Sequence, residues 1–264
     1  MPGALVAIAD PAVRGAFREW LLRTADDELI LGHRHSEWTG VGPDIESDVA
    51  MSSIAQEEMG HARVFYEQIA SDEGGDVDRI AYGRAPTEYR HAVLLERENA
   101  GWEYSIVRLS LYELFEAGRL RLLAACGREP VAPLARAIGR EERYHRLFAE
   151  TWLRRLAGAP EGRSRVQATL EAAWPEALGL FEETPADELL RREGLLGETQ
   201  AEQRESWEAA LREILTDAGL AVPQPPARGA GAGQGGRRGV HTPEFERLLG
   251  QMTEVWRSDS EAKW

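Results

Sequence analysis

Apolar residues recur at helical spacing along most of the chain. In the first such segment Phe17, Leu21, Ala25 and Leu29 stand four positions apart with charged residues between them, as in an amphipathic helix. The same pattern predicts helices over residues 11–39, 45–71, 100–126, 131–156, 163–183, 198–219 and 243–256. Convincing runs of alternating apolar and polar residues, which would indicate strands, do not occur. The sequence therefore predicts an all-α protein.

Two connections between the predicted helices are longer than turns. Residues 74–96 form an irregular stretch that suits a crossover connection in a helix bundle better than a hairpin loop. Residues 222–239 are rich in proline and glycine and predict a linker that buries little. We therefore expect three parts, which are a helical bundle with extra helices over 1–221, the linker over 222–239, and a C-terminal docking helix with a tail over 240–264.

Acidic side chains and histidines interrupt the apolar faces of the predicted helices. Glu58 and His61 lie among apolar residues of the second helix, and Glu142 and His145 do so in the fourth. Because residues i and i+3 share one helix face, each Glu-x-x-His pair can meet one metal ion. Glu142 follows Glu58, and His145 follows His61, by the same 84 residues. The two motifs therefore belong to an internal repeat.

This repeat predicts two further ligands. Glu28 precedes Glu58 by 30 residues, and Glu113 precedes Glu142 by 29. One carboxylate from each of two helices, with Glu-x-x-His from each of two others, is the ligand set of dinuclear iron and manganese proteins of the ferritin-like type. We therefore predict a ferritin-like four-helix bundle with a helix-pair repeat and additional C-terminal helices. The expected metal ligands are Glu28, Glu58, His61, Glu113, Glu142 and His145.

Some of these assignments have alternatives. Both Glu-x-x-His pairs could be surface pairs, although each lies on an apolar face. Glu116 lies one turn from Glu113 on the same face and is an alternative ligand from the third helix. Glu57 and Glu141 directly precede the motif glutamates and are expected to support the ligands from outside or to be exposed.

The other histidines have no counterpart in the repeat. His33 and His35 are expected to be structural or interface residues, and His91 and His241 ordinary loop or cap residues. The single cysteine, Cys126, excludes an internal disulfide and a thiolate metal site. Any metal must therefore use oxygen and nitrogen ligands, which suits iron and manganese.

Charge and hydropathy restrict the partners. The chain carries 31 basic and 45 acidic residues, a net charge of −14, and its arginines are spread among acidic neighbours. Nucleic acid is therefore an unexpected partner. No apolar run approaches the roughly 20 residues of a membrane span, and no basic leader precedes the first helix, so we expect a soluble cytoplasmic protein. The apolar faces of the extra C-terminal helices favour a homo- or hetero-oligomer.

Four stretches resemble one protein family. They are residues 29–38, Leu-Ile-Leu-Gly-His-Arg-His-Ser-Glu-Trp, followed by Gly42-Pro43, and residues 106–108, 143–145 and 239–242. Together with the terminal Trp264 they resemble the C-subunit family of the 1,2-phenylacetyl-CoA epoxidases, PaaC, and the resemblance covers nearly the whole chain.

The resemblance implies a subunit of a multicomponent monooxygenase of aerobic phenylacetate catabolism, to which a separate reductase supplies electrons from NADPH. It implies that a catalytic A subunit holds the di-iron site and epoxidises the ring of the CoA thioester, while the C subunit is its structural partner. C subunits typically have degenerate ligand positions, whereas this sequence presents a full set.

Three hypotheses follow from this difference. The first is a C-type subunit that positions the catalytic subunit and retains a dinuclear iron or manganese core. The second is a self-sufficient or divergent di-iron or di-manganese oxidase or oxygenase on a related substrate. The third is a metal-storing or peroxide-consuming protein, for which the tail and the long connection give no reason.

Overall fold

A computed structural model describes the chain except for residues 1–4, 6, 225–233 and 260–264. The described residues form helices and connections without a strand, so the all-α prediction is confirmed. The chain divides into two compact units. The first comprises Met1–Glu98, Thr184–Leu190 and Gly235–Trp264, and the second comprises Asn99–Glu183 and Arg191–Gln234.

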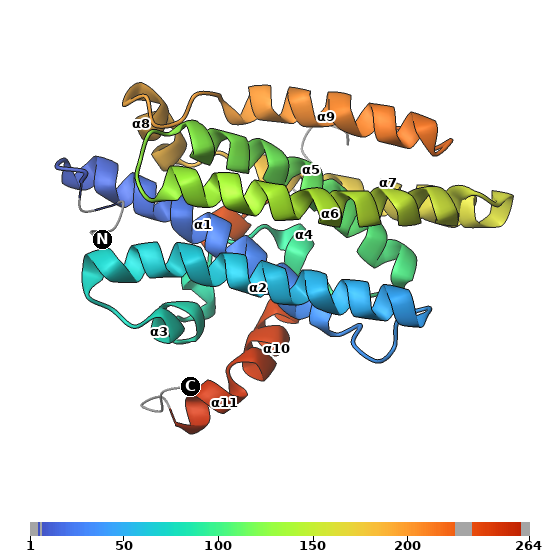
Figure 1. The fold of residues 1–264 in the computed structure, drawn as a ribbon, viewed down its shortest axis with the longest axis horizontal. Helices are drawn as coiled ribbons and strands as arrows, with labels where there is room; N and C mark the ends of the chain where they lie inside the picture. The colour runs from blue at the N-terminus through green and yellow to red at the C-terminus, as the bar shows by residue number, and fades with distance from the viewer. Residues whose placement is uncertain (1–4, 6, 225–233, 260–264) are drawn as a thin grey trace. The chain divides into compact units, whose positions relative to one another are not determined.

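The first unit is built on a pair of long helices, α1 (Pro11–Ser36) and α2 (Ile45–Glu73) (Figure 1). Asp10 and Asp44 cap their N-termini with side-chain hydrogen bonds to backbone amides, which are otherwise unsatisfied at a helix start. Gly32 lets the two helices approach closely, because a Cβ atom there would lie 3.1 Å from the Ala55 carbonyl oxygen. This close approach brings the polar residues of the two buried faces together.

Short helices complete the first unit. The stretch 74–96, expected to be irregular, contains α3 (Val77–Tyr82), the 3-10 turn η1 (Pro86–Glu88) and α4 (Val93–Glu96). A further helix, α8 (Pro185–Arg192), was not expected either. The predicted docking helix is α10 (Pro243–Met252), followed by α11 (Glu254–Ser258). The ring of Phe245 on α10 packs against Tyr89 and His91, with centroids 5.1 and 4.4 Å apart.

The second unit contains the long helices α5 (Trp102–Ala125) and α6 (Val131–Ala157), followed by α7 (Pro160–Ala177), η2 (Leu178–Phe181) and α9 (Gln200–Asp217). Aromatic side chains join them. Trp207 of α9 stacks on Trp174 of α7 at 5.1 Å and donates its indole N–H to the Leu111 carbonyl of α5 at 2.9 Å. Trp207 thereby joins α9 to both α7 and α5.

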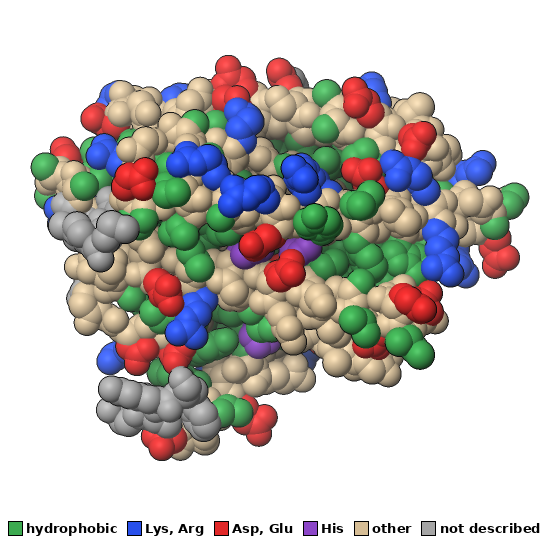
Figure 2. All heavy atoms as spheres, in the orientation of Figure 1, with side chains coloured by type: hydrophobic (Ala, Val, Ile, Leu, Met, Phe, Trp, Pro, Cys, Tyr) green, Lys and Arg blue, Asp and Glu red, His purple; other side chains and the backbone are tan. Residues whose placement is uncertain are grey.

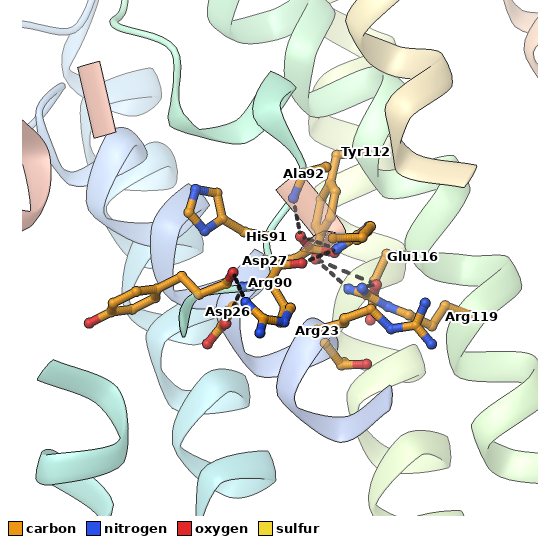
Figure 3. Close-up of polar contacts among 12 residues, drawn as sticks. Arg23, Asp26, Asp27, Arg90, His91, Ala92, Tyr112, Glu116 and Arg119 are labelled. Atoms are coloured by element: carbon orange, nitrogen blue, oxygen red, sulfur yellow. Dashed lines mark hydrogen bonds and ion pairs between the residues drawn. The ribbon is translucent and has the colours of Figure 1, made fainter. Parts of the chain in front are cut away.

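Buried aspartates tie distant segments of the first unit together. Asp26 accepts hydrogen bonds from the Tyr66 hydroxyl at 2.6 Å and from the backbone N–H of Arg90 at 2.7 Å. Asp27 accepts from the Ala92 N–H at 2.9 Å (Figure 3) and from Arg237 Nη1 at 2.7 Å. Arg237 lies at the end of the predicted linker, of which residues 225–233 are outside the described residues.

Candidate metal centre

Glu28 of α1 and His61 of α2 meet inside the first unit. Both side chains are buried, and Glu28 Oε2 lies 3.3 Å from His61 Nδ1. The structure therefore brings these two predicted ligands together, as expected if both bind one ion. Glu58, one turn before His61 on α2, is fully buried as well. Glu28, Glu58 and His61 are the predicted ligands that lie in the first unit, and we call them the first triad.

His35 holds the carboxylate of Glu58. Its Nδ1 atom lies 2.8 and 3.0 Å from the two oxygens of Glu58, and the imidazole is fully buried. A hydrogen-bond partner of this kind fixes the orientation of a ligating side chain. The repeat gave no reason to select His35, but its position seven residues after Glu28 places both on one face of α1.

Glu113, Glu142 and His145 form the second triad, in the second unit. His145 Nδ1 lies 3.3 Å from Glu142 Oε2 and 3.5 Å from Glu113 Oε1, and all three side chains are buried. Burial and the neighbouring Glu142 carboxylate raise the pKa of Glu113 well above its usual range. Burial alone would lower the pKa of His145, but the nearby carboxylates of Glu113 and Glu142 raise it above the ordinary value.

Glu116, the alternative to Glu113, has a different neighbour. It forms a buried ion pair with Arg119, whose Nη2 atom also donates to the Tyr112 hydroxyl at 2.8 Å (Figure 3). Arg119 therefore neutralises Glu116, whereas Glu113 lies beside an imidazole. This arrangement favours Glu113 as the ligand from α5. Glu57 and Glu141, expected outside the ligand set, are exposed.

The donor atoms suit a pair of hard divalent ions. Each triad offers two carboxylates and one imidazole, which are the ligands that iron and manganese accept. In the second triad, burial and then the Glu142 carboxylate raise the pKa of Glu113, so a second buried negative charge is unfavourable there without a cation. A bound divalent ion would supply the missing positive charge. The residues of each triad therefore fit a hard divalent ion.

A third histidine cluster lies in the first unit: His91 and His241 lie in connections, as expected, but both also contact Glu96. His91 Nε2 and His241 Nδ1 lie 2.6 and 2.8 Å from the same oxygen of Glu96, and the two rings stack at 4.1 Å. The Thr242 N–H donates to the other oxygen of Glu96 at 2.6 Å. Although burial opposes its ionisation, hydrogen bonds from His241 and His91 lower the pKa of Glu96 to about 2. This cluster fastens the C-terminal segment to α4.

His33 is expected to make the fold sensitive to mild acid. Burial lowers its pKa from 6.5 to about 4, and its Nε2 atom has no hydrogen-bond partner among the described residues. Because the unfolded chain binds this proton at higher pH than the folded chain, stability falls as the pH drops from about 6.5 to about 4, by at most roughly 3 kcal/mol. His33→Phe should remove this part of the pH dependence.

Urea denaturation of both proteins at several pH values between 4 and 8 measures the effect of His33. At pH 8 the two proteins should differ little in pH slope, since His33 is neutral in both the folded and the unfolded chain there. Equal slopes for both proteins below pH 6.5 would contradict the assignment.

Known proteins resemble the chain along nearly its whole length. The family model described as phenylacetic acid catabolic protein matches residues 9–264. The chain belongs to this phenylacetic acid catabolic family. Within it, the C subunit of the 1,2-phenylacetyl-CoA epoxidase of Escherichia coli (strain K12) is 29% identical over 248 residues, covering 93% of this chain and 98% of that protein. The predicted resemblance to the C subunits is therefore confirmed.

A solved structure confirms the predicted ferritin-like fold of this phenylacetic acid catabolic protein. It is described as protein 19 with aldehyde deformylating oxidase activity from Synechococcus. The two structures align with a TM-score of 0.57 and 19% identity over 92% of this chain and 98% of that one. Within the described residues, none of the helices combines the length and hydropathy that crossing a membrane requires.

Proposed function

We propose that this phenylacetic acid catabolic protein is the C-type subunit of a multicomponent monooxygenase that epoxidises the ring of phenylacetyl-CoA. Its task is to bind and position a catalytic A-type subunit, to which a separate reductase supplies electrons from NADPH in the cytoplasm. One observation carries this proposal, the likeness to the C subunit of an epoxidase over 93% of the chain.

We propose further that the two triads hold a dinuclear iron or manganese centre. Such a centre, when bound, supplies the chemistry of oxygen activation. Glu28 and His61 bind from the first unit, while His35 orients Glu58. In the second unit Glu113, Glu142 and His145, whose Nδ1 atom lies 3.3–3.5 Å from the two carboxylates, would hold the other ion. Burial of these side chains keeps bulk water away from them.

The complete triads favour a second candidate function, an oxidase or oxygenase that works without a sister subunit. Burying each of the six carboxylate and imidazole side chains costs free energy of desolvation on folding. A purely structural subunit has no need of six such buried groups. The two functions differ in what the metal does. In the first, the catalytic A-type subunit would carry out the oxygen chemistry and the centre of this chain would only stabilise its fold. In the second, the oxygen chemistry would take place at the centre of this chain.

Reconstitution separates the two functions. The purified chain is mixed with the A-type subunit and the reductase of the same organism, and phenylacetyl-CoA-dependent NADPH oxidation is measured with and without the chain. We expect co-elution of the two subunits and activity that requires both, with Glu58→Ala retaining most of it. Oxygen consumption by the chain and a reductant alone, lost in Glu58→Ala, would instead establish the second function. No co-elution and no effect on activity would refute the first.

A further inference from the structure

Helix α6 carries a row of arginines on its outer face. Arg136, Arg140 and Arg143 are exposed and stand one turn apart, and Arg146 is half-buried beside them. Figure 2 shows basic side chains gathered along this helix. None of the four forms an ion pair within the described part of the chain. The sequence suggested arginines scattered among acidic neighbours, so this row departs from that expectation.

The row borders a groove of about 280 Å³ between α5 and α6. Its apolar lining consists of small or aliphatic residues: Ala117, Leu120, Ala124, Ala135 and Gly139. A Cβ atom on Gly139 would meet only Leu120, at 3.9 Å, so the groove has room for a side chain from outside. The same four arginines, with Arg121 of α5, line its edges, and Glu142 of α6 completes the lining.

Two large apolar side chains extend the same helix surface. Tyr144 is 69% exposed and Leu147 59% exposed, and they stand three residues apart on α6. Exposed arginine and tyrosine together, next to an apolar groove, are the composition enriched in protein interfaces. Burying Tyr144 and Leu147 against a partner would also recover apolar area that is now in water.

The charge of the chain selects the partner. The chain has a net charge of −14 and therefore many carboxylates that could pair with arginines. The four arginines of α6 nevertheless form no ion pair with them within the described residues, so they are available to the carboxylates of a partner. In a twofold-symmetric dimer formed through this face, the arginines of one copy would lie against the arginines of the other. Their positive charges would repel each other. An acidic surface on a different protein fits both the row and the groove.

We propose that the outer face of α6, defined by Arg136, Arg140, Arg143, Arg146, Tyr144 and Leu147, docks an acidic amphipathic helix of the catalytic A-type subunit. The carboxylates of that helix lie against the arginines, and its apolar residues enter the groove. This inference rests on the proposed function for the identity of the partner. Helix α6 also carries Glu142 and His145 on its buried side. The partner would therefore bind the same helix that holds two candidate metal ligands.

Charge reversal on α6 tests the docking face. The full-length double variant Arg140→Glu, Arg143→Glu is compared with Arg192→Glu, Arg212→Glu, which makes the same charge change at two exposed positions away from the groove. Affinity for the A-type subunit is measured by isothermal titration at 50 and 300 mM NaCl, after circular dichroism confirms that both variants fold. We expect at least a hundredfold loss for the α6 variant, less than threefold for the control, and weaker wild-type binding at high salt.

A second variant tests the apolar part of the face. Tyr144→Ala, Leu147→Ala should weaken binding at least tenfold at both salt concentrations, since these contacts carry no charge. Binding of the α6 charge variant within threefold of the control overturns the docking proposal and leaves the proposed function standing. A wild-type chain that does not bind the A-type subunit overturns both. Dimerisation of the chain alone that the α6 variant abolishes would assign the face to a second copy and overturn this choice of partner.

Discussion

Replacing Arg237 by methionine is expected to destabilise the folded chain by about 3–5 kcal/mol. The two oxygens of Asp27 lie 2.7 and 2.8 Å from Arg237 Nη1, and both side chains are buried. Methionine keeps much of the volume of arginine but leaves a carboxylate without its cation in the core. Urea denaturation followed by circular dichroism measures the change in the free energy of unfolding.

Two further variants make the Arg237 result specific. Arg238→Met alters the exposed neighbour in sequence and should change stability by no more than about 0.5 kcal/mol. The double variant Asp27→Leu, Arg237→Met should be more stable than Arg237→Met alone, because it removes the buried charge as well as its partner. Equal losses in Arg237→Met and Arg238→Met would show that the buried pair contributes nothing.

Removing the imidazoles of the two triads is expected to abolish metal binding. A chain loaded anaerobically with Fe²⁺ or Mn²⁺ should retain about two ions, and the variant His61→Ala, His145→Ala should retain almost none, because each triad loses its nitrogen ligand. Mass spectrometry of the metal content after gel filtration gives the stoichiometry.

A variant of His35, which contacts the candidate ligand Glu58, and a matched control variant refine this test. His35→Leu leaves Glu58 in place but removes its 2.8 Å contact, so the metal should bind roughly 10–100-fold more weakly. Glu57→Ala changes the exposed residue next to Glu58 and should bind metal like the wild type. Unchanged metal content in the double histidine variant would exclude the triads as ligands.

The long helices were predictable because their apolar faces repeat over many turns. The bounds expected for α2, 45–71, agree closely with Ile45–Glu73. The short helices α3, α4 and α8 were missed, since helices of 6, 4 and 8 residues contain too few turns for periodicity to register. Their ends are set by contacts with the rest of the unit and not by a pattern of their own.

The site was only partly predictable for a different reason. The repeat predicted Glu28 and Glu113 as ligands from spacing alone, and the structure places each beside the histidine of its own unit. His35 has no repeat partner, so spacing could not select it. His241 lies 145 residues after Glu96, and local sequence contains no signal for a contact over that distance.

The order in which the chain is synthesised gives the C-terminal segment a further significance. The ion-pair partner of Asp27, Arg237, is synthesised 210 residues later. One partner of Glu96, His241, is also synthesised long after it. On the ribosome, α1 and α2 therefore emerge and pair while Asp27 still lacks Arg237 and Glu96 has only His91 of its two imidazole partners. The first unit can reach its final stability only when Arg237 and His241 have left the exit tunnel. A chain without residues 235–264 would stay a substrate for chaperones and proteases.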